Sequence, residues 1–187
     1  SMQRMAKDNV IFFGPDLETI YGAAPSPYFT ESDSLLADWR KVAAKEGLHV
    51  RVGRWNVPGE PIAVLLDFRE IYAQKDAIYA HVWERYGVKS HAAYGDYDES
   101  SMFGYYAGRS MASLYNHLPK GKGKAANRFL AHFNEWQTAF GVFYINEYCP
   151  KIGTLFTTHA TGIGRSIAGN GKPLYDYFYG YNGNQMA

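Results

Sequence analysis

Short runs of consecutive apolar residues alternate with helical segments along this chain, and this alternation restricts the possible folds more than any other feature. Residues 9–16 read NVIFFGPD and residues 62–68 read IAVLLDF, with glycine and proline next to both runs. Short, continuous apolar runs are typical of strands that are buried on both faces of a sheet. The order strand, helix, strand therefore predicts an α/β fold with a parallel sheet that is covered by helices on both faces.

The remaining segments continue this pattern. Residues 32–47 predict a helix that is capped by Ser32 or Asp33 and ends at Gly47. The tail from Lys172 predicts a helix at its start. There is no internal repeat and no linker, so the 187 residues predict a single domain. Further strands are expected at residues 49–57, 127–133 and 153–159, and further helices at residues 71–86, 96–118 and 135–148.

Charge and composition argue against several classes of partner. Lys and Arg number 19 against 18 Asp and Glu, a net charge of +1 that favours neither nucleic acid nor an anionic membrane. The basic run KGKGK at residues 120–124 is interpreted as a mobile surface loop. No stretch of about 18 apolar residues exists, so no transmembrane helix is expected. The single cysteine, Cys149, allows no internal disulfide, suits the cytoplasm and is interpreted as a packing residue.

Polar residues gather where two of the predicted strands end. HFNEW, residues 132–136, spans the end of the strand at residues 127–133, and TTHATGIGR, residues 157–165, spans the end of the strand at residues 153–159. In open parallel sheets, ligands bind in the crevice outside the carboxyl ends of the strands. Because the two stretches are adjacent in the strand–helix–strand order, we expect them to line one crevice.

Several residues of this crevice allow two interpretations. Gly162 and Gly164 resemble a phosphate-binding loop but lack the third glycine and the lysine of the known motifs, and a flexible turn is the alternative. Arg165 could bind a phosphate or carboxylate, or it could pair with Asp176. His159 could contact a ligand, which we favour, or it could cap the end of the strand.

A metal site is the main competing hypothesis, and the residues give it little support. The six histidines show no close pair at zinc spacing. Asp96 and Asp98 could hold a divalent ion against a diphosphate, but they directly precede a helix, where aspartates cap free N–H groups. We therefore favour capping. The aromatic content of 17%, with 16 tyrosines, favours carbohydrate binding only slightly.

The runs HFNEW, TLFTTHATGIGRSIAG and KPLYDY resemble the glycogen synthases of glycosyltransferase family 3, of the bacterial type. The similarity also includes NVIFFGPD, VGRWNVPGEPIAVLLDF and YGDYDESSMFGYYAG, and so extends over essentially the whole chain. It implies the GT-B architecture, in which substrate lies between two Rossmann-like domains. It also implies retaining transfer of glucose from UDP- or ADP-glucose to the non-reducing end of an α-1,4-glucan, with no metal and no cofactor.

The resemblance assigns substrate binding to a small set of residues. Asn134 occupies the position where the family has a histidine that contacts the glucosyl group. This departure leaves open a second hypothesis, in which the protein is a catalytically impaired glucan-binding or regulatory module. No catalytic residue is assigned with certainty. The implied substrate-binding residues are Asn134, Glu135, Trp136, Thr158, His159 and Arg165.

The resemblance further implies that residues 1–187 are an incomplete, acceptor-side N-terminal domain. The family's first strand, with its Lys-x-Gly-Gly turn, and the C-terminal nucleotide-binding domain have no counterpart here, so we expect the isolated chain to be inactive. The first strand would lie between the strands at residues 9–16 and 127–133. Because unpaired strand edges invite pairing, we expect a homo-oligomer or a rearranged sheet that closes the gap. The expected location is the cytoplasm.

Overall fold

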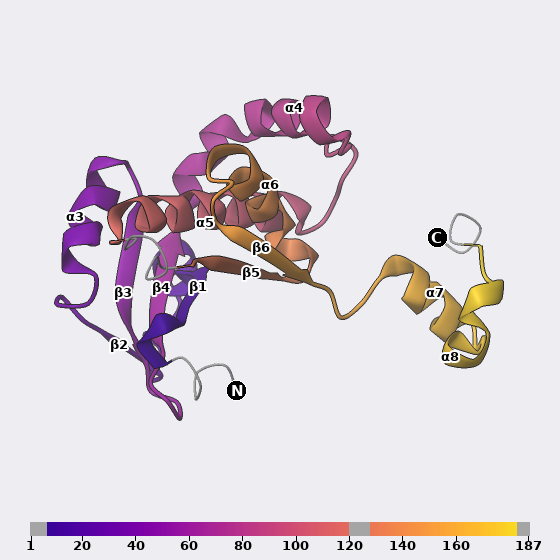
Figure 1. Cartoon of the computed structure of the whole chain (residues 1–187), viewed down its shortest axis with the longest axis horizontal. Coiled ribbons are helices and arrows are strands. Elements are labelled where there is room, and N and C mark those ends of the chain that lie inside the picture. Colours follow the sequence, from indigo (N-terminus) through magenta and orange to yellow (C-terminus); the bar gives the residue numbers. More distant parts are fainter. Residues whose placement is uncertain (1–6, 120–127, 183–187) are drawn as a thin grey trace.

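A computed structural model describes residues 7–119 and 128–182, and most of the predicted elements are present in it (Figure 1). The basic run at residues 120–124 lies outside the described residues. The strands are β1 (Ile11–Pro15), β2 (Phe29–Glu31), β3 (His49–Trp55), β4 (Ile62–Asp67), β5 (Leu130–Asn134) and β6 (Gly153–Thr157). The helices are α2 (Leu17–Tyr21), α3 (Ala37–Lys45), α4 (Lys75–Tyr86), α5 (Tyr97–His117), α6 (Ala139–Tyr148), α7 (Gly162–Gly169) and α8 (Leu174–Tyr177). Short 3-10 helices are η1 (Lys7–Asn9), η2 (Arg69–Gln74), η4 (Trp136–Thr138) and η5 (Phe178–Gly180).

The strands form two sheets rather than one. A four-stranded sheet has the order β1-β4-β3-β2, and a two-stranded sheet consists of β5 and β6. β1 pairs in parallel with β4, and β5 in parallel with β6, but β3 is antiparallel to both of its neighbours. The prediction of a wholly parallel sheet is therefore wrong. Only residues 56–61 join β3 to β4, whereas a parallel pair needs a crossover of a dozen or more residues.

The edges of the two sheets remain separate in the structure. β1 ends the four-stranded sheet, and the described part of the chain contains no pairing between β1 and β5. The sheet has therefore not rearranged to close the expected gap. Helix α5 extends alongside both sheets and links them, because it packs against α6, α3 and β1 (Figure 1).

Two hydrophobic cores lie against α5. In the first, Val52 and Val64 of the four-stranded sheet pack with Trp39 and Tyr106, and the Trp39 indole N–H donates to Ser113 Oγ at 3.0 Å. The second core lies under the two-stranded sheet. Its buried members are Ala112, Tyr115, Ala131, Phe133, Ile145, Cys149 and Ile152. The packing role predicted for Cys149 is thereby confirmed, since its side chain is buried within this core.

The predicted N-cap of the first long helix is wrong. Helix α3 begins only at Ala37, after Leu36 in a left-handed conformation with φ of 50°. Ser32 instead continues the strand pairing, because its N–H donates to Val52 O at 2.9 Å, and Asp33 accepts a hydrogen bond from Arg40 at 3.2 Å. The predicted end at Gly47 is confirmed by its φ of 70°.

The C-terminal helices α7 and α8 stand away from the rest of the molecule (Figure 1). They contact each other, and the tail is helical from Leu174, as the sequence predicts. Within residues 7–119 and 128–182, no helix combines the length and the apolar character that crossing a membrane requires.

Candidate functional site

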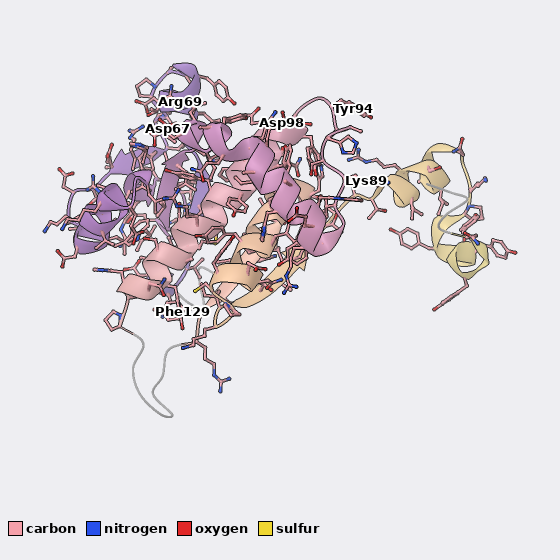
Figure 2. The ribbon with its side chains drawn as sticks, turned by 90° about the horizontal axis from the view of Figure 1, so that it is seen from above. Asp67, Arg69, Lys89, Tyr94, Asp98 and Phe129 are labelled. Atoms are coloured by element: carbon pink, nitrogen blue, oxygen red, sulfur yellow. The ribbon has the colours of Figure 1, made fainter. Side chains whose placement is uncertain are left out.

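The candidate site lies at the carboxyl ends of the parallel strands β5 and β6. Asn134 and Thr157 are the last paired residues of these strands, so the segments that follow them start side by side. Figure 2 shows Asp67, which ends β4, and Phe129, which precedes β5, at opposite margins of the molecule. The end of β4 therefore lies far from the start of β5.

Glu135 links the two strand ends through its backbone and its carboxylate. Its N–H donates to Thr157 O at 2.7 Å. Its Oε1 accepts the backbone N–H of His159 at 2.5 Å, and its Oε2 accepts the hydroxyl of Thr158 at 3.3 Å. The His159 N–H, followed by the Thr158 hydroxyl, holds the pKa of the Glu135 carboxyl below its ordinary value. This carboxylate thus orders the loop after β6.

The backbone of Glu135 is strained. Its φ of 66° and ψ of 164° lie in a region that is populated almost only by glycine. Non-glycine residues persist there only where the surrounding contacts compensate for the strain, and such residues cluster at ligand sites. The bonds from His159 and Thr158 provide this compensation. The strain therefore marks the segment after β5 as a candidate binding site.

The side chains of Asn134 and His159 contact each other across the two strand ends. His159 Nε2 lies 3.0 Å from Asn134 Oδ1. A second histidine of β5, His132, lies with its Nε2 2.8 Å from Thr157 Oγ1. All four side chains lie at the surface or only partly buried. The structure thus brings Asn134, Glu135, Thr158 and His159 into one hydrogen-bonded cluster where the two strands end.

Trp136 belongs to an aromatic stack beside this cluster. Its ring is stacked on Tyr97 with centroids 6.2 Å apart and an interplanar angle of 14°. Tyr97 in turn contacts Tyr79 at 6.0 Å and forms a hydrogen bond of 3.1 Å with Ser90. Trp136 remains 40% exposed, so one side of the stack is available to a ligand. Stacked rings with flanking hydroxyls are suited to the apolar faces and polar rims of sugars.

A hollow of about 470 Å³ lies next to this stack, between α4, the loop that follows it and the start of α5. Tyr79 is shared between the hollow and the stack. The exposed ring of Trp83 also lines the hollow and carries Lys89 above it, with the ammonium 5.7 Å from the ring centroid. The hollow therefore continues the aromatic surface that begins at Trp136.

Two of the interpretations of the TGIGR run are wrong. Gly162 and Gly164 have no positive φ and form the first turn of α7, where Thr161 Oγ1 accepts the N–H of Gly164 at 2.9 Å. They are therefore not a flexible turn. Arg165 is exposed on α7 and forms no ion pair with Asp176 within the described residues. Of the predicted site residues, Arg165 alone stands outside the cluster and the stack.

Capping by Asp96 and Asp98 is also not what the structure shows. Asp96 occupies the N-cap position of α5, but its side chain makes no capping hydrogen bond. Asp98 accepts from Lys75 Nζ at 2.6 Å and from the Tyr79 hydroxyl at 2.7 Å, and these two donors lower the pKa of its carboxyl. Asp98 thus ties α4 to α5. Among residues 7–119 and 128–182, no three His, Cys, Asp or Glu side chains are grouped so that they could hold a metal.

Tyr97 is a site residue that the sequence reasoning missed. It lies within the run YGDYDES, between Asp96 and Asp98, which the sequence offered as metal ligands or caps. Its position opposite Trp136 depends on the packing of α5 against η4, which no local pattern specifies. The only signal in the sequence was the density of tyrosine in this run.

Comparison with known proteins identifies the family to which the chain belongs. A family model described as glycogen synthase matches residues 3–186. The chain belongs to the glycogen synthase family. This family consists of glycosyltransferases of glycogen synthesis. The matched region includes both segments of the candidate site, the strained Glu135 after β5 and the loop after β6.

Curated glycogen synthases match the chain over most of its length. The glycogen [starch] synthase of Dictyostelium discoideum is 30% identical over 132 residues, which are 71% of this chain and 14% of the relative. The Caenorhabditis elegans enzyme is 23% identical over 169 residues, 90% of this chain and 24% of the relative. The human liver enzyme is 29% identical over 140 residues, 74% of this chain and 19% of the relative. The chain thus spans a quarter or less of these eukaryotic glycogen synthases, and the narrower resemblance to bacterial-type enzymes stays a prediction.

Proposed function

We propose that this chain is the acceptor-side part of a glycogen synthase. The whole protein transfers glucose, with retention of configuration, from UDP- or ADP-glucose to the non-reducing end of an α-1,4-glucan. The observation that carries this proposal is the cluster of Asn134, Glu135, Thr158 and His159 at the strand ends, within a chain that matches the glycogen synthase family from residue 3 to residue 186.

The chemistry of the site is suited to a sugar. The cluster offers amide, imidazole and hydroxyl groups, each of which can exchange hydrogen bonds with sugar hydroxyls. The stack of Trp136 on Tyr97 adds an exposed aromatic surface directly beside these groups. A few convergent polar groups next to aromatic rings are typical of small-ligand sites.

The proposal extends to the architecture and setting of the whole protein. It has two Rossmann-like domains in the GT-B arrangement, and residues 1–187 supply part of the first. The second domain supplies the groups that hold the diphosphate. The protein acts in the cytoplasm as a homo-oligomer and requires neither a metal nor another cofactor. The small share of the relatives that the chain covers, 14% to 24%, supports a longer parent protein.

A second candidate is a glucan-binding or regulatory protein without transferase activity. The observation that favours it is Asn134, because an amide cannot change its protonation state as the family's histidine can. In this case the aromatic surface of Trp136 and the neighbouring hollow would hold glucan without turnover.

A thermal-shift experiment on the full-length parent separates the candidates. A ligand that binds only the folded protein raises the unfolding temperature. We expect UDP-glucose or ADP-glucose to raise it without manganese, and the same nucleotide sugar to support transfer to maltooligosaccharides. Stabilisation by glucan without any turnover would favour the second candidate. A shift that appears only with manganese would contradict the metal-independent proposal and would direct attention to Asp96 and Asp98.

A further inference from the structure

We infer that Asn134 is a positioning residue that holds His159 in one tautomer, with the proton on Nε2 and with Nδ1 left as a hydrogen-bond acceptor for a sugar hydroxyl. This inference rests on the proposed function for the identity of the ligand but not for the tautomer. Nothing in the family match explains an asparagine at this position. Its role must therefore follow from what its side chain touches.

The tautomer follows from the chemistry of the contact. His159 Nε2 lies 3.0 Å from Asn134 Oδ1, within hydrogen-bonding distance. An amide oxygen can only accept, so the ring nitrogen that faces it must carry the proton. A neutral imidazole has one N–H and one bare nitrogen, so Nδ1 is left as an acceptor.

His159 is held by hydrogen bonds at both its backbone and its ring. The backbone N–H of His159 donates to Glu135 Oε1 at 2.5 Å, while its ring reaches Asn134. Asn134 is itself anchored, because it pairs with Thr157 in the sheet and its carbonyl accepts the hydroxyl of Thr138 at 3.1 Å. Two consecutive residues of a strand end thus restrain one histidine of the next strand end. Such restraint from hydrogen-bonded neighbours is what gives a binding group a defined direction.

The tautomer decides which ligand group His159 can recognise. A bare Nδ1 accepts a proton from a donor, and sugar hydroxyls are donors. The diphosphate bridge of a nucleotide sugar is fully ionised at neutral pH and its oxygens only accept, so it would need an N–H or a positive charge instead. We therefore assign the exposed His159 ring to the sugar portion of the substrate rather than to the diphosphate.

Nitrogen-15 NMR of the histidine rings tests the tautomer directly in the 187-residue chain, at about pH 8, where an ordinary imidazole is neutral. We expect His159 to show a protonated Nε2 and a bare Nδ1. In Asn134→Leu the two nitrogen resonances should move toward each other, because the acceptor is lost and both tautomers become populated. Asn134→Asp should restore the original pattern, since a carboxylate also accepts from Nε2–H. A predominantly Nδ1-protonated ring in the parent chain, or an unchanged pattern in Asn134→Leu, would overturn the inference.

His132 provides an internal control. Its Nε2 contacts Thr157 Oγ1 in the same two-stranded sheet, so its resonances report whether the sheet is intact. They should stay unchanged in both Asn134 variants. Thr157→Val should shift the His132 resonances and leave those of His159 in place. If His132 and His159 moved together in Thr157→Val, the two rings would not be held independently and the assignment to Asn134 would fail.

The ligand half of the inference needs a separate measurement. Maltose and inorganic diphosphate are titrated into the chain at millimolar concentrations, a range in which NMR detects weak binding. We expect maltose to shift Nδ1 of His159 and diphosphate to leave it unchanged. The reverse pattern, or no response to maltose, would refute the sugar-hydroxyl role. Because the tautomer is measured without ligand, failure of the proposed function and failure of the Asn134 contact remain distinguishable.

Discussion

Glu135 occupies a backbone conformation that side chains other than hydrogen disfavour, with φ of 66° and ψ of 164°. Alanine and glycine at this position both remove the carboxylate that accepts from His159 and Thr158. Only glycine also relieves the strain. Glycine makes the unfolded chain more flexible, however, and this offsets part of the gain in stability. We expect Glu135→Ala to unfold at a lower temperature than the parent chain and Glu135→Gly to unfold between the two, as measured by circular dichroism. Equal midpoints for the two variants would show that the strain carries no cost.

The prediction on turnover concerns Asn134. A histidine at this position can accept from Nε2–H of His159 through one ring nitrogen and donate to the sugar through the other. Loss of one oriented contact to a transition state typically lowers turnover by about 10²–10³-fold. In the full-length parent we therefore expect Asn134→His to raise kcat by about tenfold or more and to leave the donor Kd nearly unchanged. Asn170→His, placed beyond the cluster at the end of α7, serves as the control and should change neither. Equal turnover in Asn134→His and the parent would contradict the claim that residue 134 limits the chemistry.

Helices α5 and α6 approach closely because glycines face each other across their contact. A Cβ built on Gly108 would lie 2.9 Å from Gly141 O and 2.9 Å from Tyr144 Cβ, so the helices would have to move apart. Alanine favours a helix by about 1 kcal/mol over glycine, but overpacking a tight core costs about 1–3 kcal/mol. We expect Gly108→Ala to lower the free energy of unfolding measured with urea. Gly169→Ala, where a Cβ meets nothing within 4 Å, is the matched control and should cause no loss. An increase in stability of Gly108→Ala would show that the helix contact is not tight.

The elements could be predicted from the sequence where a single local pattern dominates. The apolar run of β4 and the glycine at position 47 are examples, because burial and a left-handed helix end leave direct signatures. The antiparallel direction of β3 was also predictable, since residues 56–61 are too few for a crossover. The link between Asp98 and Lys75 was not predictable, because it depends on how α4 and α5 meet.

The candidate site, too, could be predicted from the sequence only in part. The sequence placed Asn134, Glu135 and His159 together, because the carboxyl ends of neighbouring parallel strands share one edge. It could not reveal that the Glu135 carboxylate is already engaged by the loop after β6, or that Tyr97 supports Trp136. Both features depend on tertiary contacts between segments that are distant in the sequence.

At the scale of the whole molecule, the affinity for nucleotide sugar depends on how much of the cleft the chain contains. In the proposed architecture the donor lies between two domains, and the groups that hold its diphosphate belong largely to the part outside these 187 residues. We therefore expect no measurable glucose transfer by this chain and a Kd for UDP-glucose of about 1 mM or weaker, corresponding to about −4 kcal/mol. Isothermal titration calorimetry measures this, with the full-length parent as the positive control. Micromolar binding to the chain alone would refute the division of the site between two domains.

Within residues 7–119 and 128–182, β1 and β5 each have an unpaired edge, and these edges lead to the prediction on assembly. Each strand ends its own sheet, and an exposed edge presents free N–H and C=O groups that can pair with another chain. Apolar side chains accompany these edges, since Phe12 of β1 is 46% exposed and Leu130 of β5 is 60% exposed.

We therefore expect light scattering to give a dimer or a larger species for the isolated chain. A lysine on an edge strand opposes pairing, so Leu130→Lys should shift the population toward monomer. Ile163→Lys, an equally polar change at a 39% exposed isoleucine of α7, a helix that stands away from both sheets (Figure 1), should leave the assembly unchanged. A monomeric parent chain, or equal dissociation in both variants, would show that the strand edges do not mediate assembly.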